Sequence, residues 1–172
     1  MKLTGYQLMD RIEALREEAQ TINSQFTGSL FRFVEVTEQK PDPRDLMKNY
    51  AECEKKVALL QAVQAAYNVR VKVDVQGETM LLQQAIKLVG SANRVKNNWL
   101  SAVKSSQDKN NYTTYYDLVR DKTNDYAQRV VDVEECLRLS KAASDLATVL
   151  KQAIRSGNAV ETEIDIDPSL FQ

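Results

Sequence analysis

The sequence predicts a mainly helical α+β protein: four long helices in antiparallel hairpins or a bundle, with short β-strands gathered at one end. Three observations predict this fold. Apolar residues recur at alternating steps of four and three, the period of one helix face. Short runs rich in β-branched or aromatic residues separate these stretches. The length of 172 residues, with 43% hydrophobic residues, is typical of one globular domain. We expect that domain over residues 1–160 and an acidic tail over residues 161–172.

The first helix is predicted from about Thr4 to Ser24. Its apolar stripe consists of Leu8, Ile12, Leu15, Ala19, Ile22 and Phe26. Gly28 ends this pattern, and residues 30–36 (LFRFVEV) then predict a short strand because β-branched and aromatic side chains dominate them.

The second helix is predicted to begin after Asp42, which can cap it, with Pro43 in the first helical position. Its stripe consists of Leu46, Tyr50, Cys53, Val57, Leu60, Gln64 and Tyr67. This spacing resembles a coiled-coil seam. Each stripe could pack against a partner chain or against the next helix of the same chain, and we favour the same chain.

Residues 69–75 (VRVKVDV) alternate between valine and charged side chains, which predicts a half-buried strand. Gln76 and Gly77 predict a turn, and Thr79 is a candidate cap for a third helix. The stripe of that helix consists of Leu81, Ala85, Leu88, Ala92, Val95, Trp99 and Ala102. Gly90 costs about 1 kcal/mol relative to alanine in a helix, so it marks either close helix packing or a break.

Residues 105–115 are polar and predict a loop, and residues 126–131 predict a strand. Asp132 is a candidate cap for a last helix over residues 133–156. The residues expected to point inward are Leu139, Ala143, Leu146, Leu150, and Ala153 or Ile154. The pair Gly157-Asn158 predicts the end of this helix.

The tail carries four carboxylates at alternate positions, which an extended chain places on one edge: Glu161, Glu163, Asp165 and Asp167. Such an edge could bind a hard cation through oxygen ligands. We favour a solvated acidic tail without a metal.

Composition limits the chemistry that the chain can perform. With no histidine, imidazole acid–base catalysis and histidine-ligated metals are excluded. Five glycines make a glycine-rich phosphate loop unexpected, and no phosphate-loop, dinucleotide-binding, nucleophile-elbow or zinc motif is present. We therefore expect a protein that is not an enzyme and uses no cofactor.

Four parts of the chain are similar to one known family. They are Met1-Lys2-Leu3, VEVTEQKPDPRDLM (34–47), YNVRVKVDVQGETMLLQQAI (67–86), and VVDVEECL (130–137) together with IRSGNAVETEID (154–165). These parts resemble the small bacterial family labelled septicolysin-like, which also occurs in phage-related genomes. The family's name suggests a toxin, but no apolar insertion segment is present here, which argues against pore formation.

We expect the protein in the cytoplasm, or in the host cytoplasm if a phage encodes it. Cys53 and Cys136 lie among helix-favouring residues without a nearby cysteine, so we interpret them as small buried side chains in a reducing compartment. The first residues lack a signal-peptide core, and no run approaches the ~20 apolar residues of a membrane span.

Basic and aromatic residues suggest a ligand site. The candidates are Arg32, Arg70, Arg94, Lys96, Trp99, Tyr112, Tyr115, Tyr116 and Arg120. Arginine offers paired donors to phosphate, and tryptophan or tyrosine can stack on a base. A simpler interpretation stands beside this one: Trp99 continues an apolar stripe, and the tyrosines can pack loops or subunit contacts. Interspersed acidic residues disfavour long nucleic acids.

Two functions follow from these observations. The first is a homo-oligomeric binding protein that holds a small anionic, nucleotide-like ligand; in a phage, it could sequester a nucleotide immune signal. The second is a helical protein-interaction or structural module of the septicolysin-like family without a small ligand. A carboxylate metal enzyme is a weaker third hypothesis.

Overall fold

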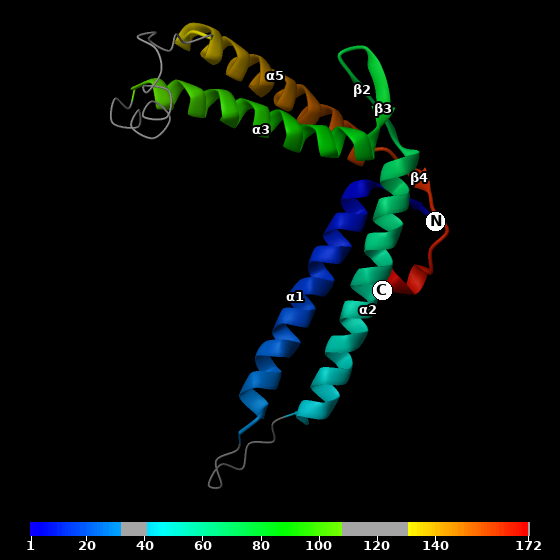
Figure 1. Cartoon of the computed structure of the whole chain (residues 1–172). Helices are drawn as coiled ribbons and strands as arrows, with labels where there is room; N and C mark the ends of the chain where they lie inside the picture. The colour runs from blue at the N-terminus through cyan, green and yellow to red at the C-terminus, as the bar shows by residue number, and fades with distance from the viewer. Residues whose placement is uncertain (32–40, 108–130, 172) are drawn as a thin grey trace, which may run out of the picture. The chain divides into compact units, whose positions relative to one another are not determined.

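The computed structural model describes residues 1–31, 41–107 and 131–171. These residues form four α-helices, packed as hairpins, and short antiparallel two-stranded sheets (Figure 1). The predicted mainly helical α+β class is therefore confirmed. Most of the predicted strand over 30–36, most of the predicted loop over 105–115 and nearly all of the predicted strand over 126–131 lie outside the described residues.

The chain divides into two compact units. The first consists of Met1–Val73, Leu81–Gln83 and Arg155–Gln172, and the second of Asp74–Met80 and Gln84–Ile154. A single domain over 1–160 stays a prediction, but the residues of the expected tail belong to the first unit.

The first unit is built on the hairpin of α1 (Gly5–Ser29) and α2 (Pro43–Arg70). Thr4 caps α1 in a capping box with Gln7. Asp42 caps α2 with Pro43 in the first turn, as predicted. The buried residues of the two helices follow the predicted stripes: Leu8, Ile12, Leu15 and Ala19 on α1, and Leu46, Cys53, Val57, Leu60 and Tyr67 on α2. Both stripes therefore pack within one chain.

A short hairpin follows α2, formed by β2 (Lys72–Val75) and β3 (Glu78–Leu81). Gln76 and Gly77 turn the chain with positive φ angles of 56° and 85°, the conformation of a tight two-residue hairpin turn. The predicted strand began too early at its first two residues, because α2 continues to Arg70 and is closed by the bond from Val71 N to Tyr67 O at 3.1 Å.

The predicted cap at Thr79 is wrong. Residues 78–81 pair with β2, so Thr79 is a strand residue. The helix α3 (Leu82–Gln107) therefore begins directly after the strand, where Leu82 N donates to Val71 O at 2.8 Å.

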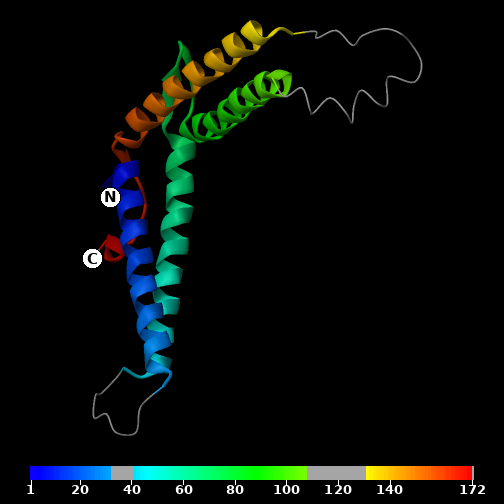
Figure 2. The same cartoon turned by 90° about the vertical axis from the view of Figure 1, so that its left-hand side faces the viewer.

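The second unit contains most of α3 and of α5 (Val133–Asn158), which lie side by side in Figures 1 and 2. The hydroxyl of Ser140 on α5 donates to the carbonyl of Lys96 on α3 at 3.3 Å. Asp132 caps α5 as predicted, accepting from Glu135 N at 2.7 Å. The helix ends at Asn158, two residues beyond the predicted end.

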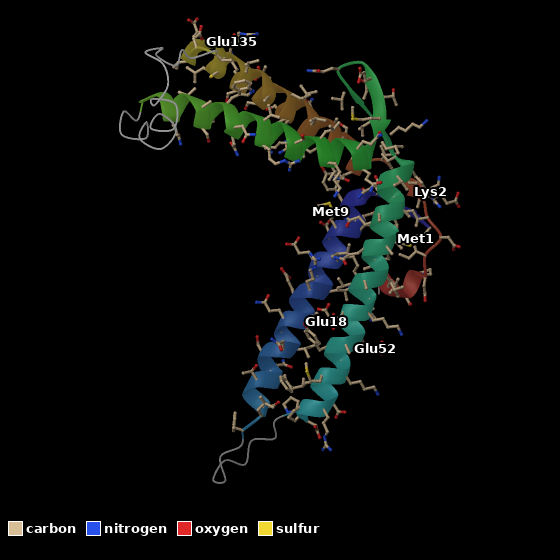
Figure 3. The ribbon with its side chains drawn as sticks, viewed as in Figure 1. Met1, Lys2, Met9, Glu18, Glu52 and Glu135 are labelled. Atoms are coloured by element: carbon tan, nitrogen blue, oxygen red, sulfur yellow. The ribbon has the colours of Figure 1, made fainter. Side chains whose placement is uncertain are left out.

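The acidic end of the chain is packed rather than solvated. β4 (Thr162–Glu163) pairs antiparallel with β1 (Lys2–Leu3), whose flanking residue Met1 is labelled in Figure 3. Ile164 is buried, and so is Leu170 in the short 3-10 helix η1 (Pro168–Phe171). The four carboxylates alternate with Thr162, Ile164 and Ile166 and stay exposed, so the expected alternation is correct, but the tail packs against the protein through its apolar side chains.

A buried hydroxyl of α2 contacts the end of α5 and the residues that follow it within the first unit. Tyr67 is fully buried, and its hydroxyl lies 2.7 Å from both the Gly157 and the Val160 carbonyl oxygens. Burial raises the pKa of this hydroxyl. A Cβ at Gly5 would come within 2.9 Å of Tyr67 Cε1, so the backbone packs closely against the ring.

Candidate interaction surface

The helix α3 exposes large apolar side chains in its middle. Leu88 is 43% exposed and Val95 is 44% exposed, although both belong to the predicted inward stripe. Ala102 follows at the same seven-residue step, and Trp99 lies beside it on the helix surface; both are half-buried. The favoured interpretation, that each stripe packs within the same chain, therefore does not hold for Leu88 and Val95.

The helix α5 carries a matching stripe. Leu139 and Leu146 follow one another at a seven-residue step, and so do Ala142 and Val149. Leu146 is 37% exposed, against the prediction that it points inward. Leu139 and Val149 are half-buried, and Ala142 is exposed.

The helices contact each other through small residues instead. Their buried positions include Ala85 and Ala92 on α3 and Cys136, Ser140, Ala143 and Ala147 on α5. Small side chains let two helix backbones approach closely, and the branched side chains then fall outside the contact. Leu88, Val95 and Leu146 are left exposed for this reason, whereas Leu150 of the same unit is buried.

Both stripes lie on the same side of the hairpin. On α3, Leu88 and Val95 stand four residues before and three residues after the buried Ala92. On α5, Leu139 and Leu146 stand at the same two offsets from the buried Ala143. In antiparallel helices that face each other, equal offsets point to the same side.

We call this combined surface the hairpin face. It consists of Leu88, Val95, Trp99 and Ala102 of α3 and Leu139, Ala142, Leu146 and Val149 of α5. A contiguous apolar patch of this kind is typical of an interaction site, whereas single exposed apolar residues are ordinary.

Charge is unevenly distributed over the two helices. α3 carries four basic residues and no aspartate or glutamate. The basic residues are Lys87, Arg94, Lys96 and Lys104. α5 mixes both signs, with Glu134, Glu135 and Asp145 among four basic residues. Arg138 donates to Glu135 near the start of α5 (Figure 3) and lowers the pKa of that carboxyl.

The structure brings together few of the predicted ligand-binding residues. Lys96 and Trp99 are neighbours on α3, but Arg94 lies roughly 140° around the helix from Trp99. Arg70 was predicted to lie on a strand, but it lies in the last turn of α2. There its Nη1 donates to Glu163 O at 3.3 Å. The remaining five candidates lie outside the described residues: Arg32, Tyr112, Tyr115, Tyr116 and Arg120. The ligand site stays a prediction.

Other chemistry has little support in the part of the chain that the structure describes. No group of three or more cysteine or acidic residues is arranged to hold a metal ion there. No helix among these residues is long and apolar enough to cross a membrane. Every buried side-chain nitrogen or oxygen there has a hydrogen-bond partner, so no orphaned polar atom marks a ligand site.

The two cysteines are buried, as predicted, and neither forms a disulfide. Burial, with a smaller contribution from Glu18, raises the pKa of Cys53. A thiol with a raised pKa is a poor nucleophile, so Cys53 is a packing residue of the α1–α2 hairpin.

No family model, no curated protein and no solved structure matches this chain. The resemblance to the septicolysin-like family therefore stays a prediction.

Proposed function

We propose that this chain is a non-enzymatic binding protein whose working surface is the hairpin face. The observation that carries the proposal is the exposure of Leu88 and Val95, 43% and 44%, in the middle of a helix, where the described residues of the hairpin leave them uncovered. This is the helical interaction module inferred from sequence, but with a different surface. The stripes of α1 and α2, which first suggested a partner, are already paired with each other.

Covering this face would release a useful amount of free energy. Burying the exposed part of a leucine or valine of this kind contributes about 1–2 kcal/mol. Leu88, Val95 and Leu146 together therefore supply several kcal/mol toward binding. Helix faces with anchors at these spacings commonly dock against other helices.

We further propose that the protein works in the cytoplasm. Its two cysteines are buried and neither forms a disulfide, which suits a reducing compartment.

A photo-crosslinking amino acid at position 95 in the full chain tests the interaction surface in the producing cell. The matched control places the same amino acid at Leu137, which is 47% exposed on the opposite side of α5. We expect discrete protein adducts from position 95 and none from position 137. Equal yields from both positions, or no adduct from either, would contradict the proposal.

A second candidate function is binding of a small anionic, nucleotide-like ligand. The observation that favours it is the concentration of four cations on α3 without any carboxylate. Calorimetry against a panel of nucleotides and cyclic nucleotides tests it, with Lys96→Gln as the variant and Lys55→Gln on α2 as the control. Heat that is lost only in the Lys96 variant would support ligand binding, and an absence of heat across the panel would dismiss it.

A further inference from the structure

We propose that the occupant of the hairpin face is the same face of a second copy of this chain. The two copies are related by a twofold axis parallel to the helices, so that α3 of each copy packs antiparallel on α5 of the other. This inference rests on the proposed interaction surface and adds the partner and its geometry. The product is a four-helix arrangement with antiparallel neighbours, a common solution for two such hairpins.

The size of the face suits a small specific dimer. Counted from the bond between Ser140 and the Lys96 carbonyl, residues 84–103 of α3 lie level with residues 133–152 of α5, so the two helices share a side ~30 Å long. Two packed helices are about 18 Å wide, so one copy offers roughly 540 Å² and the complex buries roughly 1,100 Å². This total exceeds the roughly 1,000 Å² expected of a specific interface and lies just below the range of about 1,200–2,000 Å² for stable ones.

The register of the hairpin places large residues opposite one another. The bond between Ser140 and the Lys96 carbonyl marks a common level on the two helices. Counting outward from it puts Leu88 level with Thr148, between Leu146 and Val149, and Val95 level with Lys141, between Leu139 and Ala142. Under the proposed symmetry, each residue of α3 stands over the α5 residue at its own level in the other copy. Leu88 then meets the Leu146–Val149 region, and Val95 meets the Leu139–Ala142 region.

Charged residues at the outer edges of the hairpin face favour packing of α3 on the partner's α5 over packing of α3 on the partner's α3. Asp145 lies at a level between Lys87 and Arg94, within about 6 Å of each along the helix axis. All three residues are exposed, on the outer edges of the face. With α3 over the partner's α5, each Asp145 therefore lies beside two cations, while Arg138 on the same edge of α5 is paired with Glu135 of its own helix. Stacking α3 on α3 would instead place Lys87 and Arg94 against their own copies, and like charges at an interface are unfavourable.

Sedimentation equilibrium of the full chain tests the second copy. We expect a mass of about twice 19.5 kDa for the wild type. The double variant Leu88→Glu/Val95→Glu should be monomeric, while the control Leu137→Glu should stay dimeric. A monomeric wild type would overturn the inference, and so would equal disruption by the control. If position 95 still crosslinks to a different protein in that case, the proposed interaction surface survives and only the second copy fails.

Charge reversal at the rim tests the geometry with substitutions that leave the apolar packing intact. Arg94→Glu alone and Asp145→Lys alone should each weaken dimerisation about tenfold. Asp145→Lys combined in one chain with both Lys87→Glu and Arg94→Glu should restore the dissociation constant to within about threefold of the wild type, because each new pair again has opposite signs. If the combined variant is as weak as or weaker than either single variant, the proposed stacking is wrong.

Discussion

Replacing Tyr67 with phenylalanine removes one hydroxyl from a fully buried site and leaves the ring in place. That hydroxyl lies 2.7 Å from the carbonyl oxygens of Gly157 and Val160. Without it, the Gly157 carbonyl keeps only the bond from Val160 N at 3.1 Å, and the part-buried Val160 carbonyl loses the tyrosine donor. A buried acceptor left without its hydrogen bond costs about 1–3 kcal/mol, so we expect Tyr67→Phe to lower the free energy of unfolding by that amount.

Urea unfolding followed by far-ultraviolet circular dichroism measures this loss. For a urea dependence of about 2 kcal/mol per molar, the transition midpoint should fall by roughly 0.5–1.5 M. Tyr6→Phe is the matched control, because the Tyr6 hydroxyl makes a longer bond, 3.3 Å, to Arg155 O and the residue is 40% exposed. If the two variants lose the same stability, or Tyr67→Phe loses none, the buried hydroxyl does not hold the end of the chain in place.

The same hydroxyl predicts a dependence on alkaline pH. Burial raises the pKa of Tyr67 above that of an unfolded tyrosine. The folded state therefore keeps the proton longer, and its stability is complete below about pH 10 and falls as the pH rises toward the folded pKa. Between pH 8 and pH 11, the urea midpoint of the wild type should fall more steeply than that of Tyr67→Phe. Parallel slopes would contradict the burial of this group.

Two further predictions concern backbone positions. Gly157→Ala should destabilise the protein by about 1–3 kcal/mol, because the new Cβ would lie 2.6 Å from Val73 Cγ1. Gly90→Ala should instead stabilise it by about 1 kcal/mol, because the new Cβ would meet only the flexible side chain of Arg94 at 3.5 Å. Thermal unfolding of both variants checks this, and equal effects would contradict it. Asp132→Ala should cost about 1 kcal/mol through loss of the cap on Glu135 N. Asp132→Asn should recover most of that loss, since its side chain can accept the same bond; an asparagine variant as unstable as the alanine variant would refute the cap.

Much of the first unit could be predicted because its signals are local. The four-and-three spacing from Leu8 to Ala19 is long and uninterrupted, and capping residues such as Asp42 act within one turn. The predicted strand began too early for the opposite reason. Val69 and Arg70 alternate like strand residues, but helix α2 extends through both. The surrounding structure therefore overrides their local β-propensity.

The hairpin face could not be predicted because hydrophobicity alone ranks the largest residues as the core. Leu139 and Leu146 were expected inside, yet the small Ser140 and Ala147 occupy the buried positions one residue later. The close approach of two helices depends on both helices together, so the apolar pattern of either one alone does not predict it. The tail was misjudged from its acidic residues, although Ile164, between them, was a signal of packing.

Contacts between methyl groups of different copies test the central claim most directly. In a mixture of isotope-labelled and unlabelled full chains, nuclear Overhauser effects filtered for intermolecular contacts should connect Leu88 and Val95 of one copy with Leu139 and Leu146 of the other. Such contacts would show the hairpin face buried against itself. A concentrated sample that gives no intermolecular contact, or contacts only at Leu137, would show that this face does not bind a second copy.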